Sequence, residues 1–255
     1  MHSLITGGFG FIGRYLALLL AKQGQEVTLF DVAHDAAFLE RGNGQINAIR
    51  GSLANWAEVL DAVIATRPDT IYHSGAILPP ASEATPQAAF QVNVVGTYNV
   101  LEASRICEVP HVIYASTMTS FGPDTPPLVP DDCAQHPLSM YGSSKVCCER
   151  LGEYYHRRYD LDFRGVRFPA IFGPGRAAGA GWTAYTSSAI EAAARGRSFT
   201  IRAEPETTTA LLYVKDAARG MIAIDGAPAS SLSRRVYNLN GHLVTAGALV
   251  AAIHR

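Results

Sequence analysis

Two residues four positions apart, Tyr141 and Lys145, form a pair that could move a proton. In a helix, residues at i and i+4 lie on one face, so both side chains would meet the same ligand. A tyrosine hydroxyl has a reference pKa of about 10 and is a poor base at neutral pH, but a nearby lysine cation favours the phenolate. A phenolate can accept the proton of a substrate alcohol while hydride leaves the same carbon. The pair therefore predicts oxidation of an alcohol.

Two hydroxyl residues upstream could complete this chemistry. A strand predicted over residues 111–116 ends in Ser116, and Thr117 follows it. Either hydroxyl could hold and orient the substrate oxygen. The alternative for an isolated Tyr-x-x-x-Lys is a pair on a solvated helix surface. The glycine turn and the acidic strand end described next occur in the order that a catalytic site requires, and they favour the catalytic interpretation.

The N-terminal segment predicts a site for the hydride acceptor. A short β-forming run over residues 4–6 is followed by Gly8, Gly10 and Gly13, and then by apolar residues at helical spacing over 14–22. This strand, tight turn and helix are typical of a dinucleotide site. The first glycine bends the chain, the second lets the backbone approach a pyrophosphate, and the third lets the helix pack on the strand. The helix N-terminus then offers N–H groups to the phosphates.

Asp31 favours NAD over NADP as the dinucleotide. It ends a second predicted strand over residues 26–30, about 20 residues beyond the glycines, where an acidic residue binds the adenosine ribose hydroxyls. Its charge would repel a 2′-phosphate, and residues 32–34 supply no arginine to receive one. The alternative is that Asp31 only ends a strand and starts a turn.

The composition is that of a globular protein with a well-filled core. The chain has 255 residues, of which 48% are hydrophobic and 17% are charged, and its net charge of −1 gives no reason to expect nucleic acid or an anionic membrane as a partner. The apolar run over 15–21 is too short to span a bilayer. We expect a cytoplasmic protein because no export signal is evident. The four cysteines form no CxxC pair, which predicts free thiols and no metal site.

Strand and helix patterns alternate through the first two thirds of the chain. Further strands are predicted over 46–50, 70–73, 111–116 and 162–168, with helices over 55–66, 86–107 and 141–158. This alternation predicts an α/β fold with a Rossmann-like, doubly wound parallel sheet.

The regular alternation of strand and helix patterns ends after Phe168. We expect residues 1–168 to form an NAD-binding Rossmann domain and residues 169–255 a small C-terminal substrate lobe interleaved with the sheet. The lobe is predicted to contain a helix over 182–195, strands over 199–202, 211–214 and 236–239, and a helix from about 215. The glycine-rich segment 174–183 is predicted to be mobile until substrate binds. The chain ends at Arg255 within a helix begun near Ala246, so we expect the natural protein to continue.

With these motifs combined, the chain resembles an extended short-chain dehydrogenase/reductase of the NAD-dependent epimerase/dehydratase family. The resemblance covers nearly the whole sequence. The segments that carry it are 6–13 (TGGFGFIG), Asp31, 72–76 (YHSGA), 93–103 (NVVGTYNVLEA), 114–122 (YASTMTSFG), 141–145 (YGSSK), 167–175 (RFPAIFGPG) and 213–216 (YVKD).

The resemblance implies roles for individual residues. Tyr141 would be the acid/base, Lys145 would also contact the nicotinamide ribose, and Thr117 would orient the substrate, with Ser116 as its neighbour. It further implies a homodimer built on the helices predicted over 86–107 and 141–158. The residues that would bind NAD are Gly7, Gly10, Phe11, Ile12, Gly13, Asp31, Ser52, Leu53, Ser74, Gly75, Ala76, Asn93, Tyr141, Lys145, Phe168 and Ile171.

Two segments depart from the family pattern. Residues 51–53 read Gly-Ser-Leu, where an acidic residue usually contacts adenine, so Ser52 either makes that contact or leaves it absent. Sugar-nucleotide enzymes also carry a late arginine for the nucleotide diphosphate. Residues 206–210 contain none, and Arg176 and Arg202 are the nearby candidates.

The segments leave three functions open. Residues 116–123, 152–159 and 179–185 are similar to short-chain L-threonine 3-dehydrogenases, whereas 172–176 (FGPGR) resembles the epimerases. The leading hypothesis is an NAD-dependent oxidoreductase that oxidises a secondary alcohol on a small polar substrate. The second is a nucleotide-sugar 4-epimerase or dehydratase that keeps NAD bound. The third is a non-catalytic NAD-sensing protein, against which the combination of Thr117, Tyr141 and Lys145 argues.

Overall fold

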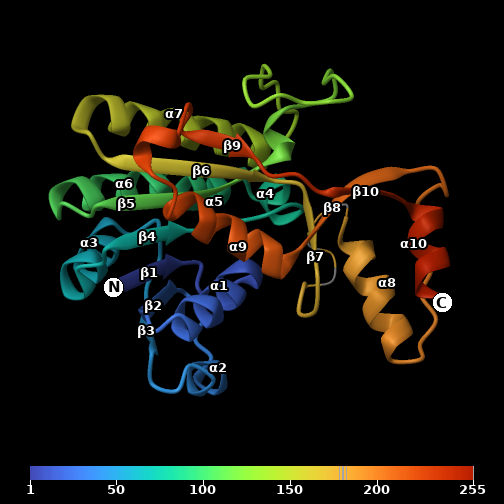
Figure 1. Cartoon of the computed structure of the whole chain (residues 1–255), viewed down its shortest axis with the longest axis horizontal. Coiled ribbons are helices and arrows are strands. Elements are labelled where there is room, and N and C mark those ends of the chain that lie inside the picture. The colour runs from blue at the N-terminus through green and yellow to red at the C-terminus, as the bar shows by residue number, and fades with distance from the viewer. Residues whose placement is uncertain (178, 180, 182, 255) are drawn as a thin grey trace.

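A computed structural model describes residues 1–177, 179, 181 and 183–254, and its main feature is a parallel sheet (Figure 1). Within these residues the sheet has seven strands in the order β3-β2-β1-β4-β5-β6-β9. The order reverses between β1 and β4, and open α/β sheets bind ligands at the carboxyl ends of strands at such a point. The predicted Rossmann-like fold is confirmed. The strands are β1 (His2–Thr6), β2 (Glu26–Asp31), β3 (Ile46–Arg50), β4 (Thr70–His73), β5 (His111–Thr117), β6 (Asp162–Phe168) and β9 (Val236–Asn238).

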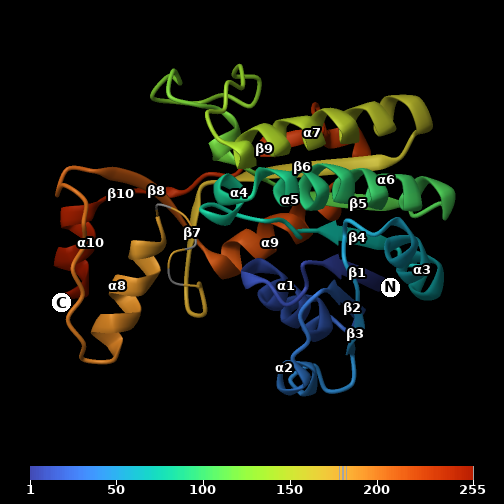
Figure 2. The same cartoon turned by 180° about the vertical axis from the view of Figure 1, so that it is seen from behind.

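Helices cover both faces of this sheet. Figures 1 and 2 show α1 and α9 on one face and α3, α6 and α7 on the other. The helices are α1 (Phe11–Lys22), α2 (Ala36–Glu40), α3 (Trp56–Thr66), α4 (Ala81–Ala84), α5 (Pro86–Ala89), α6 (Gly96–Ile106), α7 (Met140–Tyr159), α8 (Ala184–Ala194), α9 (Val214–Asp225) and α10 (Ala246–Ile253). Short 3₁₀ turns lie at Met118–Ser120 and Ala229–Ser231.

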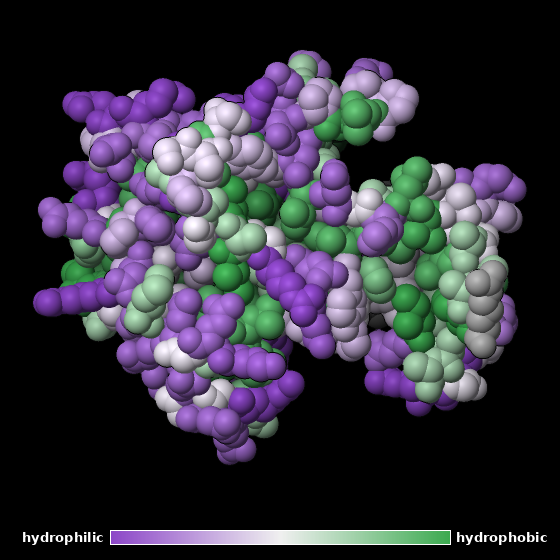
Figure 3. All heavy atoms as spheres, in the orientation of Figure 1, coloured by the Kyte–Doolittle hydropathy of each residue, from purple (hydrophilic) through white to green (hydrophobic). Residues whose placement is uncertain are grey.

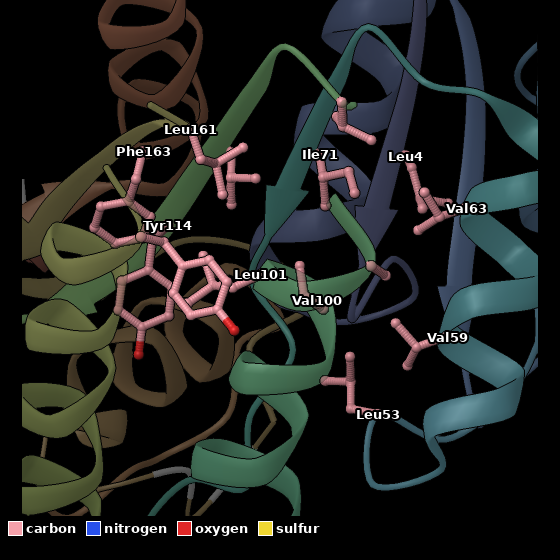
Figure 4. Close-up of a cluster of buried hydrophobic side chains, with 14 of the residues drawn as sticks. Leu4, Leu53, Val59, Val63, Ile71, Val100, Leu101, Tyr114, Leu161 and Phe163 are labelled. Carbon is pink, nitrogen blue, oxygen red and sulfur yellow. The ribbon is translucent and has the colours of Figure 1, made fainter. Parts of the chain in front are cut away.

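Alternate residues of each central strand feed two apolar clusters, one on each face. Leu4 and Ile71 pack with α3 and α6 in the cluster of Figure 4, whereas Ile5 and Tyr72 belong to the cluster under α1 and α9. Side chains alternate across a strand, and a parallel sheet is buried on both faces. This is why consecutive residues in the middle of β1, β4 and β5 are apolar.

The helix predicted over 86–107 is interrupted by a π-helical turn, Phe90–Val95, between α5 and α6. In this wider turn the Asn93 carbonyl oxygen accepts hydrogen bonds from side chains. It accepts hydrogen bonds from the Thr97 hydroxyl (2.6 Å) and from the Cys148 thiol of α7 (3.1 Å). The turn therefore fastens this helix to α7.

The C-terminal part builds a small lobe, by which we mean β7 (Ala170–Phe172), β8 (Thr208–Tyr213), β10 (His242–Thr245), α8 and α10. Strand β8 pairs with β7 on one edge and with β10 on the other. The strand predicted over 199–202 was wrong, because this segment forms an irregular connection between α8 and β8. Strand β9 returns to the main sheet beside β6, as predicted.

Two predicted segments extend outside the described residues. The segment 174–183, predicted to be mobile, and the start of the helix predicted over 182–195 include residues 178, 180 and 182, which lie outside them. Across the described part of the chain, no helix has the length and apolar character needed to cross a membrane.

The buried ring of His73 makes stability depend on pH. It lies at the end of β4 between the hydroxyls of Thr6 (2.6 Å) and Thr97 (2.9 Å), and burial lowers the pKa of His73 to about 3. A histidine in the unfolded chain has a pKa near 6.5. Between about pH 6.5 and pH 3 the unfolded state therefore binds more protons, and the free energy of unfolding falls as pH falls.

We expect His73→Asn to weaken this dependence. Between pH 7.5 and pH 5, the variant should lose about 2 kcal/mol less unfolding free energy than the parent. Urea unfolding at several pH values measures it, with His242→Asn on exposed β10 as the control. Parallel curves for the parent and His73→Asn would contradict the assignment.

Candidate active site

A cavity of about 1260 Å³ lies between the carboxyl edge of the main sheet and the small lobe. Figure 3 shows the surface hollowed between these two parts. Its wall includes the β1–α1 turn, the ends of β2, β4, β5 and β6, the start of α7, and residues of β7 and β8. Pockets for single drug-sized ligands measure about 300–1,000 Å³. This cavity has room for a dinucleotide together with a small substrate.

The turn after β1 is compact because three glycines leave no room for a side chain. Gly7 has a φ of +65°, and a Cβ there would lie 2.5 Å from the Cα of Gly75. A Cβ on Gly13 would lie 2.4 Å from the carbonyl oxygen of Gly7, which is the close packing predicted for the third glycine. The turn glycine is Gly7 rather than Gly8, because Gly8 instead packs against Leu29 of β2.

The N-terminus of α1 is suited to an anion. Gly10 is its N-cap and brings no side-chain hydrogen bond, so the first N–H groups of the helix are not capped by that residue. Phe11, Ile12 and Gly13 of this turn line the cavity. A pyrophosphate placed there would meet these donors and the positive end of the helix. The glycine cradle and the uncapped helix therefore fit the phosphates of NAD.

Asp31 is fixed at the rim of the cavity. Its carboxylate accepts hydrogen bonds from the backbone N–H of Phe9 (3.0 Å) and of Ala33 (3.0 Å). The structure also brings Arg50 of β3 beside this end, where its Nε donates to the Val32 carbonyl (3.1 Å). The segment after Asp31 gave no sign of this arginine, because it comes from the neighbouring strand.

Most of the other residues predicted to bind NAD line the same cavity. Asn93 is the exception and lies behind the wall. Its amide exchanges hydrogen bonds with the backbone of Ile77 (2.7 and 3.0 Å) and donates to Ser144 (3.3 Å). Asn93 thus fixes the loop after β4 and does not line the cavity. The predicted residues that do line it here are Ser52, Leu53, Ser74, Gly75, Ala76, Phe168 and Ile171.

Tyr141 and Lys145 face the cavity from the first turns of α7, and Thr117 faces it from the end of β5. The Lys145 ammonium donates to the Ala115 carbonyl (2.6 Å) and lies 5.7 Å from the centroid of the Tyr141 ring. Burial lowers the pKa of Lys145 to about 8. Burial also raises the pKa of Tyr141 above its usual value, and a hydrogen bond with the Thr117 side chain opposes that rise. The three predicted residues are therefore brought together.

Ser116 is used differently. Its hydroxyl donates to the fully buried carboxylate of Glu149, which also pairs with Arg167 of β6 (2.8 Å). The Thr117 hydroxyl instead accepts from the N–H of Thr119 (3.2 Å) at the cavity wall. Of the two hydroxyls considered from the sequence, this arrangement favours Thr117 for the substrate and gives Ser116 a supporting contact.

Glu83 of α4 was missed in the sequence. Its carboxylate accepts hydrogen bonds from the backbone N–H of Met140 (3.0 Å) and of Tyr141 (3.2 Å), which lowers the pKa of Glu83. The hydroxyl of Ser139 caps the same helix by accepting from Gly142 (3.0 Å). A carboxylate at a helix N-terminus is stabilising. Glu83 therefore holds the turn that carries Tyr141, across a separation of 58 residues that no local pattern reveals.

Comparison with known proteins agrees with this arrangement. The model of the NAD-dependent epimerase/dehydratase family matches residues 3–239. The chain belongs to this family. The family match and the relatives below confirm the predicted resemblance and the prediction of an NAD-dependent enzyme.

Three relatives illustrate the likeness. The chain is 34% identical to mitochondrial L-threonine 3-dehydrogenase of Sus scrofa, covering 98% of this chain and 67% of that protein, so it spans about two thirds of its length. It is 31% identical to D-erythronate dehydrogenase of Cupriavidus necator, and the match covers 100% of this chain and 82% of that protein. The solved holo structure of an L-threonine dehydrogenase from Cupriavidus necator superposes with a TM-score of 0.91 at 30% identity. The match covers 99% of this chain and 81% of that one.

The different contacts of Ser116 and Thr117 predict different defects. Thr117→Ala should lower kcat by about 100- to 1,000-fold, because one hydrogen bond to the reacting oxygen is lost. It should cost only about 1 kcal/mol of unfolding free energy, because the Thr119 N–H loses its acceptor. Ser116→Ala should cost about 1–3 kcal/mol of unfolding free energy, because buried Glu149 loses a donor. Steady-state kinetics and urea unfolding measure both. The reverse pattern would exchange the two roles.

Proposed function

We propose that this chain is an NAD-dependent dehydrogenase that oxidises a secondary alcohol on a small polar substrate, in the manner of the L-threonine 3-dehydrogenases. The observation that carries the proposal is the grouping of Thr117, Tyr141 and Lys145 in the cavity that also holds the glycine turn and Asp31. The names of the relatives support it, since both L-threonine and D-erythronate carry a secondary alcohol.

Distinct parts of the chain would hold NAD. The glycine turn and the N-terminus of α1 would bind the pyrophosphate, and Asp31 would bind the adenosine ribose. Ser74, Gly75 and Ile171 would line the nicotinamide half. When bound, NAD accepts the hydride that leaves the carbinol carbon.

The chain's own residues would move the proton. The Tyr141 phenolate takes the proton from the substrate hydroxyl, while the Thr117 hydroxyl donates to the same oxygen and orients it. Burial makes the Tyr141 hydroxyl hard to ionise, so the neighbouring Lys145 cation is needed to favour the phenolate. The Ala115 carbonyl holds that cation in place.

We also propose that residues 1–168 bind NAD and that 169–255 supply the substrate side. Thr208, Thr209 and Ala210 of β8 line the cavity opposite the glycine turn, which supports this division. The second candidate is a nucleotide-sugar epimerase, which the similarity of residues 172–176 (FGPGR) to the epimerases favours. In that case hydride returns to the substrate.

One assay separates the candidates. L-threonine, D-erythronate and UDP-galactose are each incubated with NAD, and NADH is followed by its absorbance. Net NADH from a free small alcohol supports the dehydrogenase. Conversion of UDP-galactose without net NADH would support the epimerase, and no turnover of any substrate with intact NAD binding would support the NAD-sensing protein.

The proton-transfer roles of Tyr141 and Lys145 predict one nearly inactive variant and one variant with a shifted pH profile. Tyr141→Phe should fold, bind NAD and lose about 10⁴-fold in kcat. Lys145→Met should move the rising limb of alcohol oxidation to higher pH, because without the cation the pKa of Tyr141 rises further. Steady-state rates from pH 6 to pH 10 measure both. Near-parental turnover of Tyr141→Phe would show that another group is the base.

Asp31 predicts cofactor choice. NAD should bind more tightly than NADP, because the carboxylate would repel a 2′-phosphate. Asp31→Ala should reduce the difference in affinity between NAD and NADP, since Arg50 remains nearby to bind the 2′-phosphate. Adding Arg50→Gln should increase that difference again. Calorimetric titration with both cofactors gives the dissociation constants. Tighter NADP binding by the parent would refute this.

We propose a homodimer that pairs α6 and α7 of two subunits. Tyr98 and Ile106 of α6 and Tyr154 of α7 are each at least 45% exposed, and both tyrosine rings pack on Tyr155, so they gather as an exposed apolar group of the kind that marks protein interfaces. Light scattering at tens of micromolar should give twice the monomer mass, and Tyr98→Arg with Tyr154→Arg should reduce it to one. A monomeric parent protein would contradict the proposal.

A further inference from the structure

The cavity has an apolar stretch of wall that the proposed function leaves unused. Leu78 lies in the loop after β4, Met118 directly follows Thr117, and Leu128 lies in the loop before α7. All three apolar side chains line the cavity. Proton transfer and NAD binding, as proposed above, use polar side chains and backbone groups. These apolar side chains are therefore left for another part of the substrate.

The three segments that carry these side chains meet at the turn that carries Tyr141. The loop after β4 continues into α4, where Glu83 accepts a hydrogen bond from the Tyr141 N–H (3.2 Å). The residue after Met118 packs on the same turn, since a Cβ on Gly142 would lie 2.6 Å from the Thr119 carbonyl oxygen. The loop before α7 leads directly into this turn. A substituent on a carbinol carbon held by Tyr141 would therefore lie near all three segments.

Little charge lies on this stretch of wall. Among the described wall residues of segments 74–83 and 118–129, Glu83 is the only ionised side chain. Its two oxygens already accept the backbone N–H groups of Met140 and Tyr141. An ionised group without a partner is costly to bury, whereas an aliphatic group gains free energy when it leaves water. This stretch therefore suits a hydrocarbon group.

Leu128 has apolar area that a ligand in the cavity would bury. It is 86% exposed although it lines the cavity, and Leu78 is 47% exposed on the same wall. Single exposed leucines are ordinary on a protein surface. Two that line one cavity beside a reacting group offer a hydrocarbon ligand a place to leave water. Leu138, in the same loop as Leu128, is 83% exposed but is absent from the described wall, so it provides a matched comparison.

Residues 123–128, which we call the flap, form the tip of the loop before α7. Figures 1 and 2 show this loop standing out from the sheet at the end where the small lobe lies. The His136 N–H donates to the Phe121 carbonyl (3.2 Å) and the Asn238 amide donates to the Val129 carbonyl (3.0 Å), so the flap is held at both ends.

The flap can pack on a ligand at little cost. Its residues make no hydrogen bond with any other residue that the structure describes. Three of its six residues are proline, whose φ is already fixed. Contact between the flap and a ligand therefore breaks no hydrogen bond of the flap and restricts little backbone freedom.

We infer that these side chains form a subsite for an alkyl group of the substrate. The substrate is then a secondary alcohol whose carbinol carbon bears an alkyl chain of two or more carbons, which Leu78, Met118 and Leu128 of the flap cover. One methyl group, as in L-threonine, is too small to cover side chains from three segments. The inference rests on the proposed function and specifies its substrate class.

The test varies the alkyl chain while the rest of the substrate stays the same. L-threonine is compared with 3-hydroxynorvaline and 3-hydroxynorleucine, which carry ethyl and propyl groups in place of methyl. 3-Hydroxybutyrate, 3-hydroxypentanoate and 3-hydroxyhexanoate form the same series without an amino group, each in both configurations at the carbinol carbon. D-erythronate is the reference without an alkyl group. NADH formation by the full chain at saturating NAD gives kcat/KM for the parent, for Leu128→Ser and for the control Leu138→Ser.

In at least one series, the parent should gain about 4-fold in kcat/KM for each added methylene, as expected for burial of a CH₂ group. Leu128→Ser should reduce this gain to less than about 2-fold and should leave the methyl-bearing substrate within about 2-fold of the parent. Leu138→Ser should keep the parental gain. A purely structural effect of Leu128 would instead lower kcat/KM equally for short and long substrates.

Several results would overturn the inference. Turnover of D-erythronate or of the methyl-bearing substrates without a gain from longer chains would remove the subsite and keep the proposed dehydrogenase. An unchanged gain in Leu128→Ser would remove the flap from the subsite. Equal losses for all chain lengths would mean that Leu128 only shapes its loop, and a loss confined to NAD affinity would place its side chain on the cofactor.

Failure of the proposed function would give a different result, namely no NADH from any of these substrates. Calorimetry of the same series with the NAD-saturated protein then decides the subsite. Affinity that rises with chain length in the parent and in Leu138→Ser, but not in Leu128→Ser, would support it. Affinity that does not depend on chain length would overturn it.

Discussion

The buried ammonium of Lys145 is the group on which the site depends. Only 2% of this residue is exposed, and dehydration of its charge is costly enough to bring its pKa to about 8. The Ala115 carbonyl accepts a hydrogen bond from this cation, and the Tyr114 ring lies 4.5 Å away. Both groups belong to β5, the strand that ends in Thr117. One strand therefore provides a carbonyl and a ring that contact the cation and, at its end, the hydroxyl that faces Tyr141.

This arrangement requires α7 to lie on the sheet in one register. A residue-length slip would carry Lys145 away from Ala115 and turn Tyr141 from the cavity. Polar contacts oppose such a slip at both sides of the helix. Glu83 holds its first turn, while Glu149, one turn beyond Lys145, bonds to Ser116 and Arg167 on two strands. The buried ion pair of Glu149 and Arg167 costs desolvation. We attribute its presence to the register it imposes on α7.

The parts that could be predicted are those whose signal is local. Strands β3, β4 and β6 were predicted to the residue, because each is a short segment that carries β-branched or aromatic residues. Strands β7 and β10 have three and four residues and no usable period, and both were missed. Tyr141 and Lys145 could be found because they share one helix face. From the residue pattern alone Ser116 and Thr117 could not be separated, since the deciding partner, Glu149, is 33 residues away; the family resemblance was what favoured Thr117. The same holds for Glu83 and Asn93, whose contacts are set by packing.

The two sides of the cavity are built from different kinds of group. The side of the glycine turn is largely backbone: a positive φ at Gly7, uncapped N–H groups of α1, and main-chain bonds that orient Asp31. Backbone geometry tolerates little change in sequence, since a Cβ at Gly7 or Gly13 would overlap its neighbours. The small-lobe side is made of side chains, such as Arg176 after β7 and the threonines of β8, and the small sheet is separate from β5 and α7. Side chains there can change without moving Lys145 or Tyr141. This division explains how relatives named for L-threonine and for D-erythronate can resemble this chain to nearly the same degree, at 34% and 31% identity.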